Sequence, residues 1–194
     1  MSSRLVASSV AFFVWAGATS VAAADAPSIE KKASLCFACH GPNGNSINPV
    51  IPSLAAQPGQ FISTQLIMFR EGRRKDPQMS PVATTLSNAD MNELGKYFSA
   101  QKPAAPARKI DKARLEEGRR LTQKFNCVAC HGADLKGQQH IPRLVGQQPE
   151  YLRTQLRGFK AGTRFDMDGN MTSAAQPLTE KDIDSIVEYL AASG

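Results

Sequence analysis

The feature of this sequence that most limits its fold is an internal repeat that covers nearly all of its 194 residues. Residues 36–41 (Cys-Phe-Ala-Cys-His-Gly) return as residues 127–132 (Cys-Val-Ala-Cys-His-Gly), and the segments that follow return in the same order. The displacement stays between 90 and 92 positions, which indicates a tandem duplication with small insertions in loops. The matched segments are 51–54 with 141–144, 61–66 with 151–156, Met79 with Met171, 86–87 with 178–179, and Tyr97 with Tyr189.

The join between the two copies is visible as a change of composition at residues 101–108, which are rich in Pro and Ala and lack a helical pattern. Such a stretch is typical of a short, semi-rigid linker. We therefore place the two units at residues 25–104 and 105–194. Each unit is so small that its own core is only marginally stable, which favours a large apolar ligand wrapped by its loops.

Both units are predicted to be helical, because apolar residues recur at helical intervals and no useful alternating strand pattern is present. Ser87 followed by Asp90, and Thr179 followed by Asp182, are capping-box-like starts of one helix in each unit. Further helices are expected over residues 59–71, 115–125 and 150–161. The fold class is therefore predicted to be all-α, with short helices joined by long loops.

Residues 1–24 are predicted to be a cleaved secretory signal peptide. Arg4 supplies a positive start, residues 5–21 are uncharged and mostly apolar, and three alanines ending at Ala24 match the small-residue cleavage pattern. The alternative is an uncleaved membrane anchor, for which this run is at the short end of the spanning range of roughly 17–25 residues. We favour cleavage, which predicts an exported mature protein.

All four cysteines belong to two Cys-x-x-Cys-His motifs, the attachment signature of c-type haem. Two thiols three positions apart on a helical turn reach both vinyl groups of one porphyrin and form thioethers. The histidine that follows is directed at the iron as its proximal ligand. The sequence thus predicts two covalently bound haem c groups. The residues concerned are Cys36, Cys39 and His40 in the first unit, and Cys127, Cys130 and His131 in the second.

Other uses of paired cysteines fit this sequence less well. A thioredoxin-like pair needs a βαβ context, which the sequence lacks. A zinc site made from four cysteines requires the two clusters to converge, and their long separation and the two following histidines argue against it. Two simple disulfides remain an alternative in an oxidising compartment, although a Cys-x-x-Cys loop is small and strained.

The second axial ligand decides between ligand chemistry and electron transfer, because an iron with two strong protein ligands leaves no place for a substrate. In the first unit the candidate is Met79, in a loop bounded by Pro77 and Pro81. In the second unit Met167 and Met171 compete, and register favours Met171, since it precedes a Leu-Thr pair by seven positions as Met79 precedes Leu-Ser. Thioether ligation favours Fe(II), so two low-spin haems of positive potential are expected.

Residues around these ligands have two interpretations each. The Pro52 and Pro142 carbonyls, which follow the histidines by twelve and eleven positions, either accept the second N–H of the ligand or belong to simple turns. Arg73, Arg74 and Arg164 either pair with haem propionates or form a solvated basic face.

Three further residues are expected to have no part in the chemistry. Tyr97 and Tyr189 lie on the last helix of each unit and are expected to pack one helix against another. His140 has no counterpart in the first unit and is expected at the surface.

The formal net charge of +6 makes nucleic acid a candidate partner. The basic residues are scattered, however, and loss of Arg4 with the signal peptide lowers the charge to +5. Two haems bring about four propionate charges, so the holoprotein is close to neutral and nucleic acid is not an expected partner. A basic rim can still steer an acidic redox partner.

On these motifs the sequence resembles the dihaem cytochrome c4 family over residues 30 to 192. The resemblance rests on the two haem motifs, the paired Ile-Pro-x-Leu segments with Gln57 and Gln147, the paired Thr-Gln-Leu segments, and the matched Met79 and Met171 loops. It implies two tandem all-α class I cytochrome c-type domains related by an approximate two-fold, with haem propionates facing each other at the interface. It also implies that the carbonyls of Pro52 and Pro142 are the partners of the two ligand histidines.

One departure from the family pattern concerns the helix that leads into the first haem motif. Residues 27–35 lack the helix-contact glycine that Gly118 provides in the second unit. We therefore expect the leading helix of the first unit to be shorter and to pack less closely against the helix of Tyr97.

The resemblance implies a periplasmic electron carrier, not an enzyme, that passes electrons towards terminal oxidases or other respiratory reductases. Its expected partners are redox proteins such as a terminal oxidase or a quinol-oxidising complex, with loose association at the membrane surface and no small-molecule substrate. The alternative function is the haem subunit of a periplasmic oxidoreductase, of the dehydrogenase or dihaem peroxidase type, which needs one haem to be open.

Overall fold

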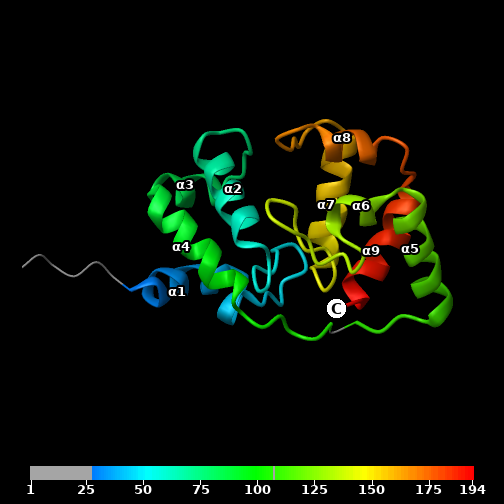
Figure 1. Ribbon diagram of the computed structural model, residues 1–194, viewed down its shortest axis with the longest axis horizontal. Coiled ribbons are helices and arrows are strands. Elements are labelled where there is room, and N and C mark those ends of the chain that lie inside the picture. The colour runs from blue at the N-terminus through cyan, green and yellow to red at the C-terminus, as the bar shows by residue number, and fades with distance from the viewer. Residues whose placement is uncertain (1–27, 107) are drawn as a thin grey trace, which may run out of the picture.

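The computed structural model describes residues 28–106 and 108–194, which form two groups of helices side by side (Figure 1). The first group contains α1 (Ile29–His40), the short 3₁₀ turn η1 (Pro42–Gly44), α2 (Gly59–Arg70), α3 (Met79–Thr84) and α4 (Asn88–Ser99). The second contains α5 (Lys112–Lys124), α6 (Cys127–His131), α7 (Pro149–Lys160), α8 (Asn170–Ala175) and α9 (Glu180–Ala192). An extended segment below both groups joins α4 to α5 in Figure 1.

The described residues contain no β-strand and only one isolated bridge, between Gln138 and Ile141, so the predicted all-α class is confirmed. None of the described helices is long and apolar enough to cross a membrane. The predicted signal peptide, residues 1–24, lies outside the described residues.

Each group of helices has its own hydrophobic core. In the first, α2 packs against α4, and α1 closes one side. In the second, α9 packs against both α5 and α7. The buried members are Ala33, Ile62, Leu66, Met91, Leu94 and Phe98 in the first core, and Leu121, Leu135, Val145, Leu152, Phe159, Ala175, Leu178, Ile183, Ile186, Val187 and Leu190 in the second.

The last helix of each unit begins with the capping box predicted from the sequence. The Ser87 hydroxyl accepts the Asp90 N–H, and the Asp90 carboxylate accepts the Ser87 N–H in return. Thr179 and Asp182 make the same pair of bonds at the start of α9. Two otherwise unsatisfied backbone donors are thereby bonded, which fixes where α4 and α9 begin.

The leading helices differ between the units, as expected from the missing glycine. In the second unit α5 ends at Lys124, and Asn126 adopts a left-handed conformation with φ 57° before α6 begins. In the first unit α1 runs without a break through the haem motif and begins only seven residues before Cys36. Gly118 brings α5 directly onto the Tyr189 side chain of α9, whereas α1 meets α4 through the buried Ala33.

The two tyrosines pack the last helix of each unit against the leading helix, as predicted: Tyr97 packs α4 against α1, and Tyr189 packs α9 against α5. The Tyr97 ring contacts the rings of Phe37 and Phe98, at centroid distances of 6.4 and 5.2 Å, and those two rings also lie 6.4 Å apart. Tyr189 packs against the core of the second unit and over Gly118. Both tyrosines are therefore structural residues.

The two units meet through reciprocal contacts. The Gln57 side chain donates to the Arg143 carbonyl at 2.9 Å and accepts the Arg143 N–H at 3.0 Å. The Gln147 side chain makes the same two bonds to the backbone of Ser53, at 2.9 and 2.7 Å. Because each residue and its repeat counterpart exchange roles, the contacts follow an approximate two-fold axis, as the family resemblance implied.

Candidate functional site

The two Cys-x-x-Cys-His motifs lie at corresponding places in the two units. In the first, Cys36, Cys39 and His40 occupy the last turns of α1, and in the second the motif forms α6. Neither pair of cysteines forms a disulfide. The histidine is deeply buried in both units, with 6% exposure for His40 and 4% for His131.

A glycine ends each motif helix immediately after the histidine. Gly41 adopts φ 77°, and a Cβ atom built there would lie 2.1 Å from the Asn45 carbonyl oxygen. A side chain at this position would therefore push the following loop away from the helix. The sharp turn lets the chain fold back over the histidine it has just left.

Both histidines are bonded in the way that a haem ligand requires. The Nδ1 atoms of His40 and His131 lie 2.8 Å from the carbonyl oxygens of Pro52 and Pro142. A carbonyl has no proton to give, so Nδ1 carries the N–H and the Nε2 lone pair is left free for a metal. Burial lowers the pKa of both imidazoles, although the bond to the proline carbonyl opposes the shift. The neutral, ligating form is therefore the stable one near neutral pH.

The proline carbonyls are held in place by the loop that follows each motif. The Leu54 N–H donates to the Gly44 carbonyl at 2.7 Å, and the Leu144 N–H donates to the Leu135 carbonyl at 2.8 Å. These bonds tie the Ile-Pro-x-Leu segment to the haem-motif loop two residues from the proline. The orientation of each histidine thus depends on the backbone of this segment, so both prolines do more than form a turn.

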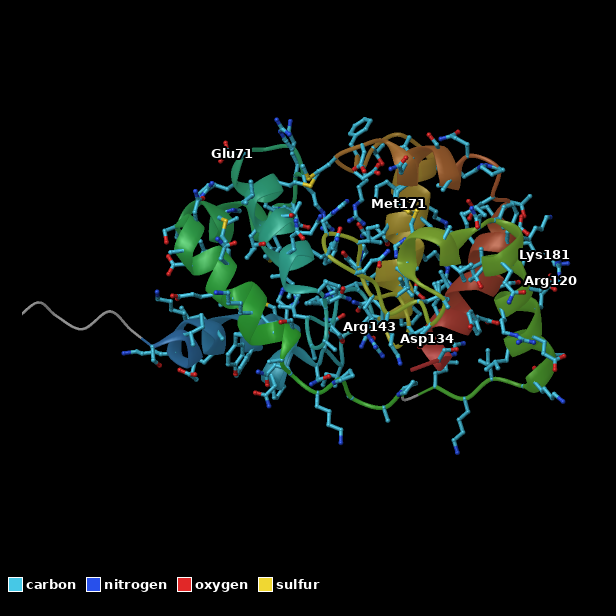
Figure 2. The ribbon with its side chains drawn as sticks, in the orientation of Figure 1. Glu71, Arg120, Asp134, Arg143, Met171 and Lys181 are labelled. Atoms are coloured by element: carbon cyan, nitrogen blue, oxygen red, sulfur yellow. The ribbon has the colours of Figure 1, made fainter. Side chains whose placement is uncertain are left out.

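The two predicted methionine ligands have matching environments. Met79 packs against the first core together with Cys36, and Met171 packs against the second core together with Cys127. The Met79 N–H donates to the Asp76 carboxylate at 2.8 Å. The Met171 N–H donates to Asp166 at 2.9 Å. Figure 2 shows Met171 within the second unit, on α8, which packs along α7.

Met167 has no such environment. Its side chain is 64% exposed and lines a surface groove with Ile67, Met68 and Arg73. Asp76 and Asp166 lie 90 positions apart, but Met79 and Met171 lie 92 apart, so two residues have been inserted in the loop that contains Met167. The structure therefore places Met171, and not Met167, at the position equivalent to Met79.

Two arginines from equivalent positions face each other where the units meet. Arg74 donates to the Gln65 side chain at 2.6 Å and, across the interface, to Tyr151 and Gln155, both at 3.2 Å. Arg164 bonds to Gln155 in the same way and reaches Gln65 at 3.5 Å. Each guanidinium also lies over the phenylalanine of its own unit, Phe69 or Phe159, about 4.5 Å from the ring centroid.

This arginine pair has the chemistry of an anion site. Neither guanidinium forms an ion pair with a carboxylate of the described residues, and the Arg164 Nε is buried without a partner. Burial lowers the pKa of Arg164 to about 10, and the like charge of Arg74 adds to the shift. Burial alone raises the pKa of the Tyr151 hydroxyl, but the two guanidiniums outweigh it and lower that pKa. Two adjacent, partly desolvated cations call for negative charge between them.

These residues fit a haem in each unit. Each unit offers two thiols and an imidazole nitrogen on one helix end, a thioether beside the same core, and a guanidinium without a carboxylate. Of the arginines considered from the sequence, Arg74 and Arg164 lie at the interface, whereas Arg73 is exposed.

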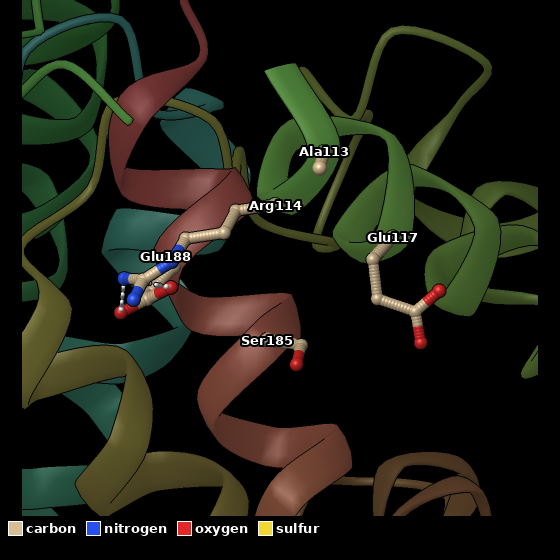
Figure 3. Close-up of a pocket in the computed structure, with 5 residues that line it drawn as sticks. All are labelled: Ala113, Arg114, Glu117, Ser185 and Glu188. Atoms are coloured by element: carbon tan, nitrogen blue, oxygen red, sulfur yellow. Dashed lines mark hydrogen bonds and ion pairs between the residues drawn. The ribbon is translucent and has the colours of Figure 1, made fainter. Parts of the chain in front are cut away.

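Other candidate sites carry less chemistry. Within residues 28–106 and 108–194 no three His, Cys, Asp or Glu side chains converge to hold a metal ion, which excludes a joint zinc site there. His140 is half-buried, with Nε2 4.0 Å from Asp168. A shallow pocket between α5 and α9 has Arg114 and Glu188 paired with each other at its edge (Figure 3).

Sequence reasoning did not single out Gln65, Gln155 and Tyr151 as partners of the arginines, nor Asp76 and Asp166 as the groups that fix the methionine loops. The signal was present, because Gln65 with Gln155 and Asp76 with Asp166 each lie 90 positions apart.

Comparison with known proteins agrees with this geometry. The family model Cytochrome c matches residues 115–193. A cytochrome c4 from Azotobacter vinelandii is 33% identical over 189 residues, which cover 87% of this chain and 89% of that protein. The thiosulfate dehydrogenase electron acceptor of Thiomonas intermedia (strain K12) is 35% identical over 190 residues, with coverage of 92% and 85%. The crystal structure of reduced recombinant cytochrome c4 from Pseudomonas stutzeri is similar with a TM-score of 0.79 and 30% identity, covering 89% of this chain and all of that one.

The fold and the paired motifs define a dihaem c-type cytochrome, an electron carrier and not an enzyme, with haem c bound covalently at Cys36 and Cys39 and at Cys127 and Cys130. Relatives that match nearly the full length of the chain narrow this class to one family. The chain belongs to the cytochrome c4 family.

Proposed function

We propose that the protein is a periplasmic shuttle whose two haems are ligated by His40 and Met79 in the first unit and by His131 and Met171 in the second. The observation that carries this is the matched pair of buried histidines, each with Nδ1 bonded to a proline carbonyl and Nε2 left free. A bound haem supplies reversible one-electron exchange between Fe(II) and Fe(III).

The residues of this chain restrict that chemistry to electron transfer. A histidine and a methionine that both bind one iron leave no position for a substrate. The buried site of each histidine also excludes water from the ligand. The arginine pair between the units would hold the propionates of both haems close together, so electrons would pass from one unit to the other.

The proposed organisation of the chain is a signal peptide at residues 1–24 followed by cytochrome c domains at 25–104 and 105–194. The small-residue pattern ending at Ala24 supports export, and the two separate cores support the division into domains. The carrier would receive electrons from a quinol-oxidising complex and deliver them to terminal oxidases or other respiratory reductases.

A second candidate is supported by one specific observation. The relative from Thiomonas intermedia is described as an electron acceptor of thiosulfate dehydrogenase. The chain would then serve as the haem subunit or direct acceptor of a periplasmic dehydrogenase, with the same two ligand sets. This role changes the partner and leaves the chemistry of the haems unaltered.

A spectroelectrochemical titration of the holoprotein tests the ligation. We expect two one-electron waves at positive potential and a near-infrared sulfur–iron band in the oxidised protein. Carbon monoxide should bind to neither ferrous haem at neutral pH. Strongly negative waves, or one haem that binds carbon monoxide readily, would contradict the proposed ligands. Turnover with candidate oxidases and dehydrogenases as partners then separates the two functional candidates.

A further inference from the structure

The two glutamines that join the units, Gln57 and Gln147, have buried side chains with defined hydrogen-bond partners. Gln57 is only 4% exposed and Gln147 only 6%. Each uses both ends of its side-chain amide, and each is bonded to the backbone of one residue of the other unit, Arg143 or Ser53. Figure 2 shows Arg143 near the middle of the molecule, where the units meet.

The residue that each glutamine contacts directly follows the proline that holds a haem-ligand histidine. The peptide between Pro52 and Ser53 accepts the His40 N–H at its oxygen, at 2.8 Å, and donates its own N–H to Gln147 at 2.7 Å. One peptide group thus joins the histidine of the first unit to a side chain of the second. The peptide between Pro142 and Arg143 repeats this arrangement. Its oxygen accepts the His131 N–H at 2.8 Å, and its N–H donates to Gln57 at 3.0 Å.

We propose that Gln57 and Gln147 are positioning residues that act across the interface, each tuning the haem of the other unit. Gln147, in the second unit, sets the acceptor strength of the Pro52 carbonyl and with it the basicity of His40. Gln57 does the same for His131. The inference rests on the proposed ligation of iron by these two histidines.

The direction of the effect follows from the polarity of the peptide group. A peptide whose N–H donates to an acceptor becomes a better acceptor at its own oxygen, because hydrogen bonds in a chain polarise one another. A stronger acceptor at Nδ1–H makes the imidazole a stronger donor to the iron, which favours Fe(III). Removal of the glutamine should therefore raise the potential of the haem in the opposite unit.

The competing explanation is that the glutamines only hold the units together. Gln148 offers a matched control, because its side-chain amide also crosses the interface but donates to the Ser46 carbonyl and not to either proline peptide. A purely adhesive role predicts similar consequences for Gln57→Leu, Gln147→Leu and Gln148→Leu. The tuning role predicts that only the first two shift a potential, and that they shift different ones.

The experiment uses holoprotein in which Met79→His has moved the first haem to lower potential, so that the two waves can be assigned. In this background Gln147→Leu should raise the low wave alone, Gln57→Leu should raise the high wave alone, and Gln148→Leu should move neither. The milder variants Gln147→Asn and Gln57→Asn, whose side chains are one methylene shorter, should give the same crossed pattern if a leucine variant does not fold.

The possible results separate this inference from the proposed function. If Met79→His does not lower one wave, the proposed ligation fails, and this inference fails with it. If the waves separate as expected but the glutamine variants move the wave of their own unit, both waves equally, or neither, the tuning role alone is refuted.

Discussion

The close contact of α5 with α9 at Gly118 gives a prediction in which steric overpacking and helix propensity change the stability in opposite directions. A Cβ atom at Gly118 would lie 2.2 Å from the Tyr189 Cβ and 2.6 Å from the Ser185 carbonyl oxygen. Neither neighbour is the flexible end of a side chain, so Gly118→Ala must move α5 away from α9. Ordinary contact begins at 3.4 Å, and the separation must therefore grow by more than 1 Å.

The cost of that separation exceeds the gain from a better helix former. Overpacking of a core typically costs about 1–3 kcal/mol, and this contact disturbs a whole helix pair, so we take the upper end. Gly to Ala inside a helix returns about 1 kcal/mol. Gly118→Ala should thus destabilise the protein by about 2 kcal/mol, which lowers Tm by roughly 4–8 °C in a chain of this size.

Thermal unfolding of the oxidised holoprotein, followed by circular dichroism and Soret absorbance, measures this shift. The exposed residue Arg119 on the same helix supplies the control, and Arg119→Ala should change stability by less than about 0.5 kcal/mol. A rise in Tm for Gly118→Ala would mean that helix propensity dominates, and would refute the packing argument.

Three further predictions concern the ligands and the first unit. Met171→Ala should abolish half of the sulfur–iron band and leave the first haem unchanged, whereas Met167→Ala should leave both haems as they are. Cys127→Ala should impair attachment of the second haem only, which mass spectrometry of the mature chain would detect as one missing porphyrin. Asp90→Asn should cost about 1 kcal/mol near neutral pH, because the carboxylate that accepts the Ser87 N–H and pairs with Lys32 loses its charge, as measured by denaturant unfolding. The hydrogen bond from Lys32 holds the Asp90 pKa at about 2, so the stabilisation is present above about pH 4, and the difference between wild type and variant should fade between pH 4 and 2.

Local features of this protein could be predicted from its sequence because they depend on residues near one another in the chain. The capping boxes at Ser87 and Thr179, the haem motifs, and the ends of α2 and α7 are of this kind. The register that favoured Met171 over Met167 also depends only on counting, and the structure gives its reason as an insertion of two residues after Asp166. Whether Met171 binds the iron remains a prediction.

Contacts between the units could not be predicted in the same way. Nothing near Gln65 or Tyr151 in the chain shows that Arg74 reaches Tyr151 and Gln155 of the other unit. Such contacts depend on how two folded units dock, which a periodic pattern does not encode. The repeat nevertheless limits them strongly, because under an approximate two-fold any contact from one unit implies its counterpart from the other.

The variable position in the Ile-Pro-x-Leu segments shows how this interface constrains the sequence. Its occupants are Ser53 and Arg143, two side chains with nothing in common. The Ser53 hydroxyl accepts the Ser46 N–H, and the Arg143 Nε donates to the Val145 carbonyl, so each side chain stays within its own unit. The glutamines bind only the N–H and C=O that every residue except proline provides. A backbone contact therefore leaves this position free to vary, while the glutamine that contacts it must stay.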